Sequence, residues 1–67
     1  MKTVLELLDA APEEQIKRMQ IAFKSVAAGE WDDAAFTLSN AARETSGQFS
    51  SDCAELAEFC NSMVQAS

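Results

Sequence analysis

Histidine and tyrosine are missing from this sequence, and proline occurs only once and glycine twice. Histidine is the side chain that most often performs acid–base work at neutral pH, so its absence excludes Ser–His and Cys–His nucleophiles. There is also no calcium-loop spacing and no glycine-rich phosphate loop. We therefore predict no catalytic residues, no cofactor and no metal site, and we do not expect an enzyme.

Basic residues are scarce as well, since five Lys and Arg face eleven Asp and Glu, for a net charge of −6. This balance opposes direct binding to nucleic acids and to anionic membranes, because both are polyanions. A basic protein partner remains compatible with it. The apolar run at the amino terminus is broken by Glu6 and Asp9, so we expect neither a signal peptide nor a membrane span, and a cytoplasmic location.

The chain is short enough to limit its own stability. Residues 1–67 make a single helical domain, and a chain of this length buries only about 60% of the surface that it exposes when unfolded. Small domains usually need a disulfide, a metal or a partner subunit in addition to their core. With two cysteines and no metal motif, a partner subunit is the leading candidate.

The most informative segment is residues 29–42, which we interpret as a tight turn followed by a helix. Gly29 can end one helix. The apolar and small residues after it then recur with helical spacing. They are Trp31, Ala34, Ala35, Leu38, Ala41 and Ala42. The pattern predicts a helix from about Trp31 to Glu44 that packs closely against its neighbour in a helical hairpin.

Three further helices are predicted around this one. Thr3 and Glu6 have the spacing of a capping box, which favours a first helix from about Val4 to Ala10. A second helix should begin at Pro12 and end near Ala28, with an apolar stripe of Ile16, Met19, Phe23 and Val26. A fourth should begin after Ser50 or Ser51, with a stripe of Cys53, Leu56, Ala57, Cys60, Met63 and Val64. The fold class is therefore all-α: a small antiparallel bundle of three to four helices that contains a helix-turn-helix hairpin.

The hairpin resembles a single tetratricopeptide-repeat unit over about residues 19–44. The run Gly29-Glu30-Trp31-Asp32-Asp33-Ala34 matches the family's turn in residue type. Ala41 stands where the family keeps a small residue, and Ile21 and Ala22 resemble its apolar–small pair. The resemblance implies a helical hairpin and a role in peptide binding. The sequence contains no second copy of the pattern, and one unit cannot form the family's concave groove.

Cys53 and Cys60 lie seven residues apart, which places them about 10.5 Å apart along a helix. This separation is too large for a disulfide within the helix. We interpret them as small buried hydrophobes at stripe positions, with contact across a dimer seam and redox sensing as alternatives. Trp31, at the head of its stripe, is expected to pack in the core rather than act as an exposed anchor.

Three apolar residues lie off the predicted stripes or at their flank, and together with one residue of the last stripe they are our candidate interface residues. They are Leu5, Phe36, Phe59 and Met63. A domain of this size cannot cover all of them, so an apolar surface patch is expected.

The favoured function is a non-enzymatic protein–protein interaction module that binds a second copy of itself or another protein. The alternative is an acidic inhibitor that mimics nucleic acid and occupies a basic groove on a DNA- or RNA-handling protein. A small module of this kind is compatible with an accessory protein of a bacterium or a phage.

Overall fold

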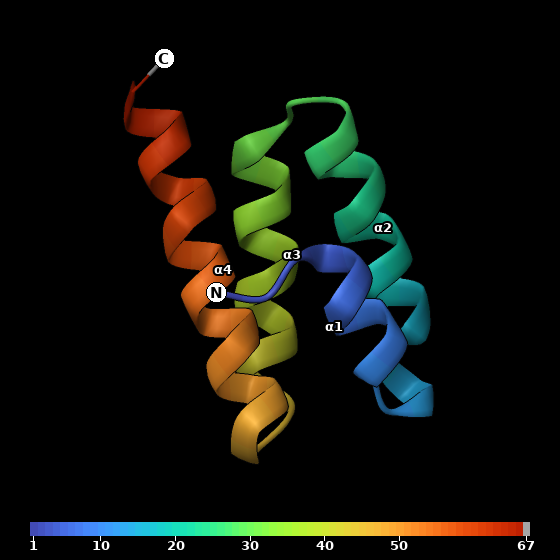
Figure 1. Cartoon of the computed structure of the whole chain (residues 1–67). Helices are drawn as coiled ribbons and strands as arrows, with labels where there is room; N and C mark the ends of the chain where they lie inside the picture. The colour runs from blue at the N-terminus through green and yellow to red at the C-terminus, as the bar shows by residue number, and fades with distance from the viewer. Residues whose placement is uncertain (67) are drawn as a thin grey trace.

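The computed structural model describes residues 1–66, and these residues form α-helices and no strands (Figure 1). The elements are α1 (Val4–Ala10), a 3₁₀ turn (Glu13–Gln15), α2 (Ile16–Ala27), α3 (Trp31–Arg43) and α4 (Gly47–Ala66). Successive α-helices run in opposite directions. The prediction of a small antiparallel all-α bundle is therefore confirmed.

α1 begins with the predicted capping box. The Glu6 backbone N–H donates to Thr3 Oγ1 at 3.2 Å, and the Thr3 backbone N–H donates to Glu6 Oε1 at 2.9 Å. The bond from the Thr3 backbone, with a further one from the Thr3 hydroxyl to Glu6 Oε1 at 3.2 Å, holds the pKa of Glu6 below its ordinary value, because both favour the charged carboxylate. The helix ends at Ala10, and the backbone of Ala11 is extended ahead of Pro12.

The turn between α2 and α3 is a Schellman motif. Gly29 has φ = 74°, a left-handed conformation that glycine adopts without steric cost. The Glu30 N–H donates to the Ser25 carbonyl at 2.8 Å, and the Gly29 N–H donates to the Val26 carbonyl at 3.0 Å. Both bonds satisfy carbonyls at the end of α2, so the chain reverses within three residues and the predicted hairpin forms.

α4 begins earlier than the sequence predicted, at Gly47 rather than after Ser50 or Ser51. Gly47 has φ = 73°, and this conformation redirects the chain directly into the helix. Ser50 therefore lies inside the first turns of α4, where its hydroxyl donates to the Ala42 carbonyl at 2.6 Å. The Thr45 hydroxyl donates to the Ala41 carbonyl at 2.7 Å. Both hydroxyls satisfy carbonyls at the end of α3, and the prediction was wrong to place Ser50 before the start of α4.

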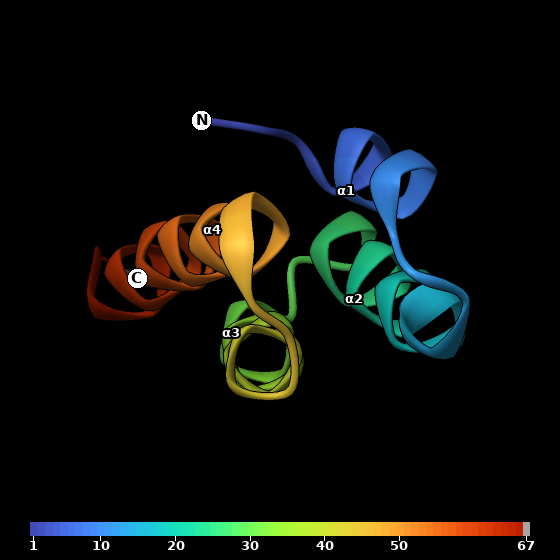
Figure 2. The same cartoon turned by 90° about the horizontal axis from the view of Figure 1, so that it is seen from below.

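α3 lies between α2 and α4, and α1 packs against α2 and α4 on the side away from the outer surface of α3 (Figure 2). The largest side chains that are fully buried come from all four helices. They are Leu7, Met19, Leu38, Cys53 and Cys60. Ala34, Ala35 and Ala41 of the α3 stripe are buried as well, and Ala42 is half-buried; these small side chains let neighbouring helices approach α3 closely.

The buried side of α2 differs from the predicted stripe. Met19 is fully buried, but Ile16 and Phe23 are 38% and 40% exposed. The core positions on this helix also include Ala22 and Ser25. The smaller side chains of α2 face the bundle, and this rotates Ile16 and Phe23 towards the surface. Val26 packs against the core, so the predicted stripe was right for Met19 and Val26 and wrong for Ile16 and Phe23.

Candidate interaction surfaces

The candidate interface residues are largely exposed, but they do not form one patch. Phe36 on α3 is 69% exposed, Leu5 on α1 is 59% exposed, and Phe59 on α4 is 40% exposed. Met63 lies one helical turn beyond Phe59 and is half-buried. Leu5 lines one groove, Phe36 borders two hollows and Phe59 lines a pocket. These three sites have no lining residue in common. The surface therefore has several distinct apolar sites.

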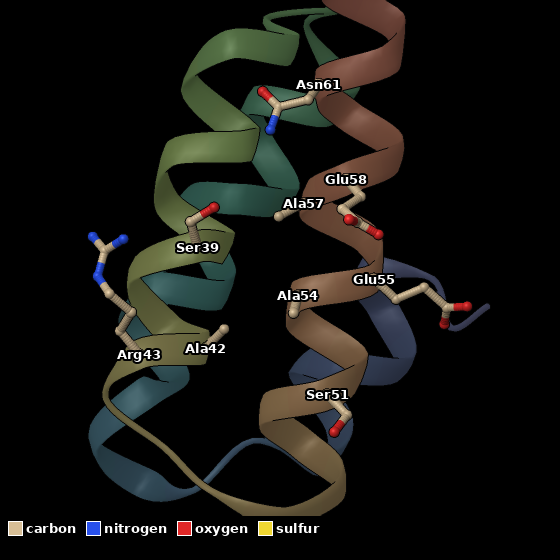
Figure 3. A pocket seen from close by; sticks show the side chains of 9 residues that line it. All are labelled: Ser39, Ala42, Arg43, Ser51, Ala54, Glu55, Ala57, Glu58 and Asn61. Carbon is tan, nitrogen blue, oxygen red and sulfur yellow. The ribbon is translucent and has the colours of Figure 1, made fainter.

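One groove runs along α3 and α4 on the face away from α1 (Figure 3). Small side chains line it, among them Ser39 and Ala42 from α3 and Ala54 and Ala57 from α4. A second hollow continues it towards the start of α3, because Ser39, Arg43 and Asn61 line both. Phe36 and Val64 line this continuation. We call the two together the α3–α4 groove.

Phe36 also borders a second groove, which lies between α2 and α3 and includes Ile21 and Asn40. We call it the α2–α3 groove. Phe36 thus lies between two hollows. Each hollow contains one further exposed aliphatic side chain, Ile21 in the α2–α3 groove and Val64 in the α3–α4 groove. Phe36, Ile21 and Val64, with the two grooves, form a surface that we call the Phe36 face.

The charges of the two outer helices differ in sign. α2 carries three basic residues and no acidic ones: Lys17, Arg18 and Lys24. α4 carries three acidic residues and no basic ones: Asp52, Glu55 and Glu58. Lys17 and Arg18 line the α2–α3 groove, whereas Glu55 and Glu58 line the α3–α4 groove. In Figure 3 the side chain of Glu55 points away from the groove, towards solvent.

Phe59 lies at a third site, an apolar pocket of about 210 Å³ beside the amino terminus. Its ring meets Trp31 edge-to-face, with ring centroids 6.2 Å apart and an interplanar angle of 86°. Trp31 packs against the core, as predicted. Residues 1–4 line the pocket as well, and Lys2 Nζ lies 3.6 Å from Oδ2 of the buried Asp52. The amino-terminal segment thus forms one wall of this pocket.

Both cysteines lie inside the bundle and are unpaired. Burial raises the pKa of the Cys53 thiol to about 11, with a smaller contribution from the negative charge of Asp52. Burial also raises the pKa of Cys60. The interpretation as small buried hydrophobes is therefore confirmed. Neither sulfur reaches the surface where a dimer seam would need it.

Residues 1–66 contain no group of three or more His, Cys, Asp or Glu side chains placed to hold a metal ion. None of the helices in the same residues combines the length and hydropathy that crossing a bilayer requires. Comparisons with protein-family models, curated proteins and solved structures gave no match.

Ile21 and Val64 are surface residues that the sequence analysis did not single out as interface candidates. Val64 was assigned to the core stripe of the last helix, but it lies near the end of α4, and 39% of it is exposed. Ile21 lies between the core residues Met19 and Ala22 in the sequence, but its side chain is 56% exposed because it points away from their face of the helix. Ile21 could have been recognised in the sequence as an apolar residue that is out of phase with the stripe of its helix.

Proposed function

We propose that the protein is a small, non-enzymatic interaction module that works as a homodimer through the Phe36 face. The observation that carries this proposal is the 69% exposure of Phe36, flanked by the exposed aliphatic residues Ile21 and Val64. Aromatic side chains are enriched at protein interfaces and contribute strongly to binding when buried there. A second copy would cover Phe36 and add the buried apolar area that so short a chain lacks.

A reducing compartment such as the cytoplasm is part of the proposal. Cys53 and Cys60 are both unpaired, and they pack as apolar side chains. Free buried thiols of this kind suit a compartment in which thiols stay reduced. The net charge of −6 supports a protein partner rather than a nucleic acid or an anionic membrane.

Replacement of Phe36 by aspartate tests the proposal, because the side chain lies outside the core. Phe36→Asp should leave the helical circular dichroism spectrum unchanged and raise the dimer dissociation constant at least about thirtyfold, measured by analytical ultracentrifugation. Leu5→Asp is the matched control, since Leu5 is 59% exposed in a groove on another side of the molecule. We expect it to change the constant less than about threefold. Equal effects of the two changes, or no effect of Phe36→Asp, would contradict the assignment.

The alternative function is an acidic inhibitor that mimics nucleic acid, and the specific observation in its favour is the acidic surface of α4. Glu55 and Glu58 are exposed, and no basic residue lies on that helix. The acidic residues in the first turns of α1 and α3 contribute less to this argument. Glu6 holds the α1 cap and Asp32 accepts a hydrogen bond from the backbone of Asp33. A mimic should lose its basic partner at about 0.5 M salt, because screening weakens exposed charge pairs.

A further inference from the structure

The apolar pocket beside the amino terminus is lined by every α-helix of residues 1–66. Its volume is about 210 Å³. The apolar side chains that line it are Val4 from α1, Val26 from α2, Trp31 from α3, and Leu56, Phe59 and Cys60 from α4. We call this site the Trp31 pocket. It has no lining residue in common with the two hollows that Phe36 borders, so it is a separate feature of the surface.

The Trp31 pocket extends from the core to the surface. Val4 and Leu56 are each 6% exposed and Cys60 is fully buried, so these three residues form its inner end. Phe59 is 40% exposed and lies nearer to solvent. Residues 1–3 form one wall, and this segment runs from α1 across to α4 (Figures 1 and 2). A small molecule can therefore reach the pocket beside Phe59 while the bundle stays folded.

The polar side chains of the pocket are already bound within the chain. Lys2 and Thr3 are the lining residues that carry them. The Thr3 hydroxyl accepts from the Glu6 N–H and donates to Glu6 Oε1, each at 3.2 Å, and Lys2 Nζ lies 3.6 Å from Asp52 Oδ2. Burial raises the pKa of the Cys60 thiol, so the inner end carries no charge at neutral pH. A charged ligand would therefore lose its hydration in the pocket without gaining a new partner.

The size of the pocket and its aromatic rings define the ligand further. An apolar cavity of about 150 Å³ is large enough to bind benzene, and water makes few hydrogen bonds in such a site. The Trp31 pocket is somewhat larger, so it can hold one ring with a short substituent. The rings of Trp31 and Phe59 already meet edge-to-face, with centroids 6.2 Å apart, and a ligand ring would extend this aromatic contact.

We propose that the Trp31 pocket binds a small, neutral molecule that consists of one aromatic ring with a short apolar substituent. This site goes beyond the proposed homodimer and does not depend on it. The ligand ring packs against Trp31, Phe59 and the buried Leu56, and the affinity comes from the apolar area that leaves water. An anionic ligand is disfavoured as well, because the carboxylates of Glu6 and Asp52 hold the polar groups of the wall and the chain has a net charge of −6.

An NMR titration of the full chain with toluene tests the proposal. The reporter is the indole N–H of Trp31, which is the single tryptophan of the chain. Toluene should shift this signal until it saturates, with a dissociation constant of about 1 mM or lower. Benzoate is the matched control, because it has the same ring and carries a negative charge. We expect its dissociation constant to be at least about tenfold higher.

Two replacements of phenylalanine by alanine locate the site. Phe59→Ala removes part of the pocket lining and should raise the toluene dissociation constant at least about fivefold. Phe36→Ala removes the same atoms from a side chain that is exposed and lies outside the pocket. It should change the constant less than about twofold. Circular dichroism of each variant checks that the helices are retained.

The outcomes distinguish this site from the proposed dimer. Saturation at Trp31 that Phe59→Ala weakens and Phe36→Ala leaves unchanged supports the pocket. A Trp31 signal that does not move up to the solubility limit of toluene would overturn it, and this result needs no variant. Equal affinities for benzoate and toluene, or equal effects of the two variants, would overturn it too. A chain that stays monomeric and binds toluene at Trp31 would contradict the homodimer and support the pocket.

Discussion

Truncation of Leu38 should remove a large part of the stability of this domain. Leu38 lies on α3, the helix between α2 and α4, and its side chain is fully buried. A Leu→Ala change at such a site costs about 3–5 kcal/mol, because the lost transfer free energy adds to the cost of the cavity. At about 0.05–0.15 kcal/mol per residue, a chain of 67 residues has about 3–10 kcal/mol in total. The cost of Leu38→Ala should therefore be a large part of the free energy of unfolding, or exceed it.

Urea unfolding followed by circular dichroism measures this loss, and Leu5 supplies a control of identical chemistry. Leu5→Ala removes the same atoms from a side chain that is 59% exposed, so we expect a cost below about 1 kcal/mol. All samples need one protein concentration, since dimer formation would make the midpoint depend on it. If Leu38→Ala proved no more destabilising than Leu5→Ala, the placement of α3 at the centre of the core would be wrong.

Two further predictions concern the turn glycine and the buried thiols. Gly29→Ala should destabilise the protein by about 1 kcal/mol in the same urea assay, because φ is 74° there and no atom within 4 Å would clash with a new methyl group. A cost near zero would contradict the left-handed turn. The thiol of Cys53 has a pKa of about 11 in the folded protein, above its ordinary value near 9. Its contribution to the free energy of unfolding is therefore complete below pH 9 and is lost as the pH rises through 11. Cys53 alone should contribute a slope that approaches about 1.4 kcal/mol per pH unit in this window, and Cys53→Ala should remove that share while the share of Cys60, whose pKa is also raised, stays.

The sequence predicted those elements whose signals are local. The α1 bounds follow from Thr3 and Glu6, which face each other across one helical turn. The turn into α3 follows from Gly29, because few other residues adopt the conformation that it needs. The start of α4 was missed because the Ser50 hydroxyl bonds to α3 rather than to its own helix. That bond depends on the packing of two helices.

The candidate surface was predictable in part and for a similar reason. Phe36 is out of phase with the stripe of its own helix, so its exposure could be inferred from spacing alone. The grooves on either side of Phe36 could not be inferred, because they depend on how α2 and α4 pack against α3. Helical periodicity fixes a residue's angle around its own helix, but not its height relative to a neighbouring helix.

The molar mass of the unmodified chain in solution is the most direct test of the proposed homodimer. Light scattering in reducing buffer, over a hundredfold or greater range of concentration, should show a mass that rises from 7.3 kDa towards twice that value. A mass that stays at 7.3 kDa up to millimolar concentration would contradict the account, and would leave the Phe36 face to a different protein partner.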